Sequence, residues 1–247
     1  MRSISLLKHT LGVFLFTTAI ISCKKDENQQ APENKKTGFG NISYIAKASG
    51  SGVQTTVKSS STLSTVPVTW TSATIWVEKI SFAGKTNNLL DTTIMVEKNL
   101  NIFSADALAG AIKLPSGSYK DVAVKLFCRK SPKSEFAFDF RGTFTNTKGT
   151  TDSVRVGSSY PFEANVSVTN IVIDPSDRYK ATFYFDLSKV LTGISNSMLE
   201  TTIVPFSGAN NQKTYIIWKG GSADQPFYNQ IIQNWQSVGS FEIIKEN

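Results

Sequence analysis

The sequence predicts an all-β protein, an antiparallel β-sandwich or barrel, over residues 38–247. Apolar and polar residues alternate with a period of two in many short segments. These segments are rich in β-branched and aromatic residues, and turn-forming Gly, Pro, Asn or Ser separates them. This combination is typical of antiparallel strands joined by turns. The length suits a single all-β domain, so we expect residues 38–247 to form one domain.

Five strands are predicted in the first half of this region, at 40–46, 66–70, 73–82, 93–97 and 119–128. In the third strand the apolar phase runs through Ile75 and Val77 and then slips by one residue before Ile80. Such a slip predicts a β-bulge near Glu78 and Lys79. Cys128 follows the apolar phase of the fifth strand, which predicts a buried thiol.

Later strands are predicted by five alternating sets of large apolar residues. These are Phe136, Phe138, Phe140 and Phe144; Val154 and Val156; Val166 and Val168; Ile171 and Ile173; Phe183 and Phe185. We expect residues 101–110 to form one helical turn that ends at Gly110.

Two short helices are predicted near the C-terminus. Residues 187–193 follow Asp186, and residues 226–237 follow Asp224 as a cap. In the second helix Phe227, Ile231 and Trp235 fall on one face, which we expect to pack on the sheet. Residues 202–247 are expected to be a C-terminal addition that contains this helix.

The N-terminus has the layout of a secretory signal. Arg2 and Lys8 precede the charge-free apolar run 11–21. Eleven residues are too few for a bilayer-spanning helix, which needs about 20. Residues 1–22 are therefore interpreted as a signal peptide, and the polar stretch 23–37, which lacks aromatic residues, as a disordered tether.

The segment Ile20-Ile21-Ser22-Cys23 resembles the lipobox of bacterial lipoproteins. The resemblance implies cleavage before Cys23 and lipidation of this residue, hence a membrane partner reached through a lipid anchor. Lys25-Asp26-Glu27 resembles the surface-export signal of lipoproteins from the Bacteroidota. We therefore expect an outer-membrane protein on the cell surface, with a periplasm-facing location as the alternative.

Histidine chemistry is absent from the predicted mature chain, because His9 lies within the signal peptide. This excludes a Ser-His-Asp triad and imidazole-bound zinc or copper. We expect no catalytic residue, no metal and no cofactor. A carboxylate-only hydrolase is the remaining enzymatic alternative, and its candidate acids are Asp139, Asp174, Asp177 and Asp186.

The net charge is mild. Without Arg2 and Lys8 the 26 basic residues become 24, against 19 acidic ones. The basic residues are spread along the chain, whereas nucleic-acid-binding proteins usually cluster theirs. We expect no nucleic-acid partner.

Residues 112–126, "IKLPSGSYKDVAVKL", resemble a segment of uncharacterised lipoprotein domains of the Bacteroidota. Leu114, Pro115, Gly117 and Tyr119 match its Leu-Pro-x-Gly-x-Tyr pattern. The resemblance implies a transthyretin-like or immunoglobulin-like β-sandwich, and it implies no particular activity. Two further segments, around Thr92 and Ser153, resemble the O-glycosylation pattern of exported Bacteroidota proteins.

Four aromatic residues are candidates for ligand binding: Trp76, Trp70, Trp218 and Tyr160. Trp and Tyr rings stack on sugars while their polar edges donate hydrogen bonds. Trp76 points away from Ile75 and Val77 and is the first candidate for an exposed platform. We expect a non-enzymatic binding module for a glycan or another extracellular ligand. The alternative is a structural or adhesive subunit of an envelope or fimbria-like assembly with an outer-membrane protein partner, and no oligomeric state is assigned.

Overall fold

The computed structural model describes residues 37–49, 65–104, 107–129, 136–208, 211–219 and 225–246. The predicted signal peptide, the lipidation site Cys23 and most of the tether lie outside the described residues. Residues Lys36–Asn247 form one compact unit.

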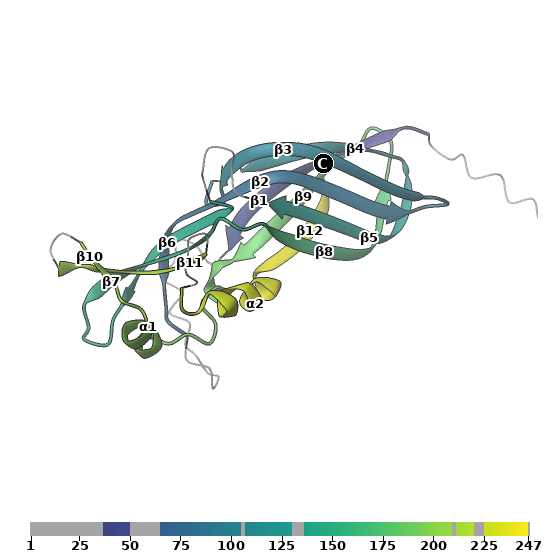
Figure 1. Cartoon of the computed structure of the whole chain (residues 1–247). Helices are drawn as coiled ribbons and strands as arrows, with labels where there is room; N and C mark the ends of the chain where they lie inside the picture. Colours follow the sequence, from purple (N-terminus) through teal and green to yellow (C-terminus); the bar gives the residue numbers. More distant parts are fainter. Residues whose placement is uncertain are drawn as a thin grey trace, which may run out of the picture. The chain divides into compact units, whose positions relative to one another are not determined.

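The protein is an all-β sandwich of two packed sheets, as predicted (Figure 1). The four-stranded sheet has the order β12 (Gly239–Glu246), β9 (Arg178–Asp186), β1 (Phe39–Ser49), β4 (Leu108–Pro115). The eight-stranded sheet has the order β10 (Phe206–Ser207), β11 (Lys213–Lys219), β7 (Thr151–Ser158), β6 (Phe138–Thr145), β2 (Thr69–Lys85), β5 (Gly117–Cys128), β8 (Phe162–Ile173), and β3 (Leu89–Asn101) also pairs with β2. Two pairs, β1 with β9 and β11 with β7, are parallel, and the others are antiparallel.

The long strand β2 divides the eight-stranded sheet. Its residues 69–75 pair with β6, and its residues 77–85 pair with β5. Between them, the Trp76 N–H donates to the Ala137 carbonyl and the Trp76 carbonyl accepts from Arg129. The register also shifts between Val77 and Lys79, which confirms the predicted bulge. Beyond this point β6, β7 and β11 extend away from β5 and β8 (Figure 1).

The core lies between the sheets and follows the period-two pattern. In β1, for example, Ile42, Tyr44 and Ala46 are buried and alternate with less buried neighbours. Cys128 is also fully buried, as predicted, and its burial raises the pKa of its thiol.

Among the described residues, the helical elements that join the strands are η1 (Leu187–Lys189), α1 (Asn196–Thr202) and α2 (Tyr228–Val238). Of the predicted helix 187–193, only Leu187–Lys189 form a helical element, the 3₁₀ turn η1. The carboxylate of Asp186 caps this turn by accepting a hydrogen bond from Ser188 N. Ile231 and Trp235 of α2 are buried, which confirms the predicted face. Neither α1 nor α2 is long and apolar enough to cross a bilayer, and the same holds for every helix of the described residues.

Several elements differ from the sequence-based expectation. The predicted helical turn in 101–110 is wrong at its C-terminal end, because Leu108, Ala109 and Gly110 begin strand β4. A Cβ at position 110 would lie 2.6 Å from Ile94 Cδ1, so the end of the Ile94 side chain would have to move. The glycine that suggested a helix end lies instead within strand β4.

The C-terminal segment is integrated into both sheets. Strand β11 pairs with β7 of the larger sheet, and β12 pairs with β9 of the smaller one. The predicted C-terminal addition, residues 202–247, therefore contributes strands to both sheets. Helix α2 begins after Phe227, a residue with φ of 67° that provides no side-chain cap, and the predicted cap Asp224 lies outside the described residues.

Candidate ligand-binding groove

A groove of about 280 Å³ lies on the outer face of the larger sheet, beside β7 and β11. Its lining combines aromatic and aliphatic side chains with one arginine and one glutamine. The described residues that line it are Phe136, Arg155, Gly157, Val204, Phe206, Ile216, Trp218 and Gln225. Val204 and Phe206 are 89% and 67% exposed, so the groove has an open apolar rim.

Two aromatic rings and one guanidinium group form the centre of the groove. The rings of Phe136 and Trp218 are perpendicular, with centroids 5.1 Å apart. The guanidinium carbon of Arg155 lies 4.8 Å from the centroid of Phe136, within the range of a cation–π contact. The three side chains therefore support one another before any ligand arrives.

Strand register places Trp218 and Asp139 in one row across the sheet. Trp218 of β11 pairs with Gly157 of β7, and Gly157 pairs with Asp139 of β6. Residues in register on adjacent strands present their side chains to the same face. Gly157 has no side chain, so it leaves a gap in this row between Trp218 and Asp139. A Cβ at position 157 would lie 3.1 Å from the Phe138 carbonyl oxygen, a close contact that glycine avoids.

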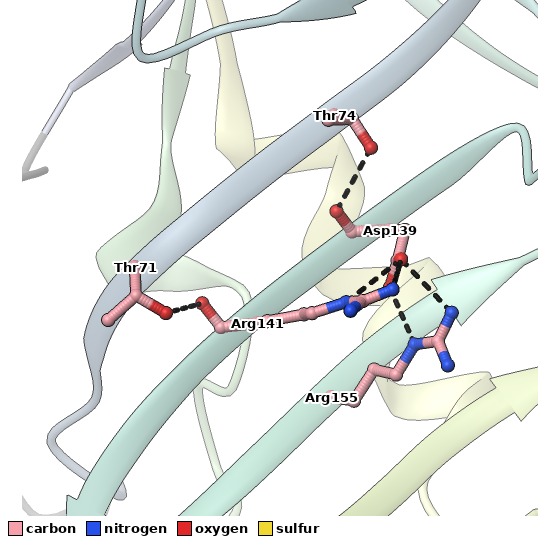
Figure 2. Close-up of polar contacts among 5 residues, drawn as sticks. All are labelled: Thr71, Thr74, Asp139, Arg141 and Arg155. Carbon is pink, nitrogen blue, oxygen red and sulfur yellow. Dashed lines mark hydrogen bonds and ion pairs between the residues drawn. The ribbon is translucent and has the colours of Figure 1, made fainter.

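Asp139 holds two arginines beside the groove (Figure 2). Arg155 Nε and Nη2 donate to the two carboxylate oxygens at 2.7 and 3.0 Å. Arg141 Nη2 and Nε donate to Oδ2 at 2.7 and 3.1 Å. The carboxylate is almost buried, at 12% exposure, whereas Arg141 and Arg155 are 55% and 30% exposed. The three groups together carry one net positive charge.

Contacts with β2 fix the position of this cluster. The hydroxyl groups of Thr71 and Thr74 donate to the carbonyls of Arg141 and Asp139 (Figure 2). At Gly142 a Cβ would lie 2.7 Å from the Thr69 carbonyl oxygen, so the close approach of β2 to β6 requires glycine there. The charged side chains therefore project from backbone that neighbouring strands hold in place.

The structure separates the four aromatic candidates. Trp218 lines the groove, whereas Trp76 lies half-buried on the outer face of β2 and is not among the described lining residues. Tyr160 is 50% exposed, and its ring lies 5.5 Å from Lys219 Nζ.

Trp70 does not present a surface platform. Its exposed fraction is 6%, its ring packs against Phe140, and its Nε1 donates to the Leu187 carbonyl at 3.0 Å. The first residues of β2 lie under the turn at η1, which buries this indole. We therefore leave Trp70 out of the candidate site.

The other candidate acids, Asp174, Asp177 and Asp186, form ion pairs with lysines. Asp174 and Asp177 both form ion pairs with Lys245 of β12, and Asp186 forms one with Lys189. The hydrogen bond to Asp177 is the main cause that raises the pKa of Lys245.

Both predicted O-glycosylation residues lie within strands. Thr92 of β3 pairs with Phe82, and Ser153 of β7 accepts a hydrogen bond from Gln212. Modification at these residues stays a prediction.

Phe136 and Arg155 line the groove but were not predicted as site residues. Asp139, Arg141 and Arg155 occupy the outward phase of strands whose inward phase is Phe138, Phe140, Val154 and Val156. The sequence signal for this cluster was a row of opposite charges in the outward phase of two successive strands. Such residues can form cross-strand ion pairs when the two strands are adjacent.

A scan against protein-family models found no match, and searches of curated proteins and of solved structures found no similar protein. A function for this chain therefore has to be inferred from the groove itself.

Proposed function

We propose that this chain is a lipid-anchored, non-enzymatic protein of the outer membrane that binds carbohydrate in the groove beside Trp218. The lipobox-like segment at Cys23 supports the anchor, and the export-signal-like Lys25-Asp26-Glu27 supports display at the cell surface. The groove supports the binding role.

One observation carries the proposal: Trp218, Phe136 and Arg155 converge on a groove whose lining includes Gly157. An indole offers a flat apolar face to the C–H face of a sugar, while Arg155 and Gln225 offer donors to its hydroxyl groups. Because strand pairing and the ion pairs to Asp139 already hold Arg155, binding costs less side-chain ordering. The volume is slightly below the roughly 300–1,000 Å³ of pockets for drug-sized ligands, which suits one sugar unit of a chain.

A glycan array with the full chain, purified in detergent, tests this proposal. We expect binding to at least one class of plant, host or microbial glycan. Trp218→Ala should abolish that binding, whereas Trp76→Ala should retain it. The pair is matched, because both indoles are half-buried on the outer face of the same sheet. Binding lost only in Trp76→Ala would place the platform on β2 instead, and no binding to any glycan would contradict the proposal.

A second candidate is the assembly subunit joined by strand addition. At the outer edge of β11, the two residues of β10 pair only with Lys213 and Thr214, and no other described strand pairs there. The Lys219 carbonyl accepts from Ser159 N, which follows β7, so the backbone of Lys219 faces β7. Successive residues of a strand direct their N–H and C=O groups to opposite edges, so those of Ile216 and Trp218 point to the outer edge of β11. Hydrogen exchange distinguishes the two roles. Protection of these amides in the native membrane but not in the isolated chain would favour assembly.

A further inference from the structure

Resting on the proposed carbohydrate site, we propose that its ligand is an acidic sugar, whose carboxylate pairs with Arg155. The charge balance at the groove is the first observation. Arg141 and Arg155 together carry two positive charges against the single negative charge of Asp139. None of the described residues that line the groove is acidic. A ligand carboxylate would bring this cluster to neutrality.

The orientation of Arg155 is the second observation. Its Nε and Nη2 face Asp139, so the Nη1 amino group points away from Asp139 (Figure 2). A guanidinium group has five N–H donors, and the two bonds to Asp139 use two of them. Arg155 is also a lining residue of the groove, so a ligand bound there would contact this side chain. Arginine donors bind carboxylates strongly because both partners are charged and planar.

The position of the aromatic pair is the third observation. Arg155 lies over Phe136, and Phe136 contacts Trp218 edge to face. A sugar stacked on the indole would therefore have its substituents near the guanidinium group. A hexuronic acid carries its carboxylate directly on the ring, so ring stacking and the ion pair can form together. Asp139 acts as a positioning residue, because it holds Arg155 in this orientation.

Methyl esterification provides the test, because it removes the ligand charge and keeps the sugar. Polygalacturonate, alginate and hyaluronan are each compared with their own methyl ester, with neutral polysaccharides alongside. Binding to the full chain in detergent is measured by calorimetry. We expect at least one acid form to bind ten or more times tighter than its ester. Equal affinity for acid and ester, or binding only to neutral polysaccharides, would overturn the acidic-sugar inference and leave the carbohydrate site standing. Binding to none of these polysaccharides or of the array glycans would overturn both.

Variants locate the charge that matters. Arg155→Gln should lower affinity for the acid form to that for the ester, and Asp139 would still be paired with Arg141. Arg178→Gln is the control, because it changes the net charge equally but lies on β9 of the other sheet. Equal losses in the two variants would show a general charge effect and overturn the assignment to Arg155. The ester comparison needs no variant, so it decides the question even if Arg155→Gln fails to fold.

Discussion

Trp235 of α2 stacks on Phe138 of β6, with ring centroids 5.1 Å apart and ring planes inclined by 18°. The same indole contacts Phe140 and Phe162 at centroid distances of 5.8 and 4.6 Å. It also contacts Phe185 of β9 at 5.9 Å. Phe185 belongs to the smaller sheet and the other rings to the larger one. Trp235 therefore joins the helix to both layers of the sandwich.

Replacing Trp235 with alanine should lower the free energy of unfolding by about 3–5 kcal/mol, the usual cost of removing a large buried aromatic side chain. Ile232→Ala, on the exposed side of the same helix, should change it by only about 0.5 kcal/mol. Urea denaturation measures both values. Similar losses in the two variants would show that the helix, and not the indole, supplies the stability.

Trp70→Phe tests whether this indole is structural. The variant removes the Nε1 hydrogen bond to the Leu187 carbonyl and some packing, so we expect a loss of about 1–3 kcal/mol in unfolding free energy. Any glycan binding should be unchanged, because Trp70 is buried away from the groove. Unaltered stability combined with lost binding would contradict this assignment.

Tyr44 predicts a loss of stability at alkaline pH. Burial raises the pKa of its hydroxyl group above the ordinary value of about 10. Above pH ~10 the unfolded chain releases this proton while the folded chain keeps it, so the stability is complete below pH ~10 and falls as the pH rises further.

Tyr44→Phe removes this titration and also a buried hydroxyl group that has no hydrogen-bond partner among the described residues. Near neutral pH we expect the variant to match the parent or exceed its stability by about 1 kcal/mol. Its denaturation midpoint should fall less than the parent's between about pH 8 and pH 11. Identical alkaline profiles would show that Tyr44 does not control this loss.

Cys23→Ser should abolish lipid labelling and release the protein from the outer membrane, if Cys23 carries the anchor. Growth with labelled fatty acid, followed by membrane fractionation, measures both effects. Cys128→Ala is the matched control. Its thiol is buried in the core, so the label should remain. Retention of label in Cys23→Ser would contradict the lipoprotein assignment.

Patterns within short stretches of sequence predicted strands, a β-bulge and the buried face of a helix, because these depend on residues that are close along the chain. The alternation of apolar residues located β1, β5 and β9, since a strand buried on one face shows that period by itself. It located β2 as two strands, 66–70 and 73–82, where the structure has one strand, Thr69–Lys85. The slip after Val77 predicted the bulge, and the spacing of Ile231 and Trp235 predicted the buried face of α2.

Pairing between distant segments was not predictable in the same way. Strands β10, β11 and β12 went unrecognised as sheet strands, and the first three residues of β4 were assigned to a helical turn that ends at Gly110. Glycine is ambiguous in a sequence, because it serves both helix ends and close backbone approach. Only the pairing of β4 with β1, which places Gly110 opposite Tyr44, shows that Gly110 lies in a strand.

The sequence by itself determined the all-β class, the inward or outward phase of many side chains and the expectation of an exported, lipidated chain. Tertiary structure alone decided that Trp70 is buried and that Trp218 meets Phe136 and Arg155. Periodicity specifies the face of a strand that a side chain occupies, but it does not specify which strand lies beside it. In the groove, β11 pairs with β7 in parallel and places Trp218 opposite Gly157, a pairing of distant segments that periodicity does not encode.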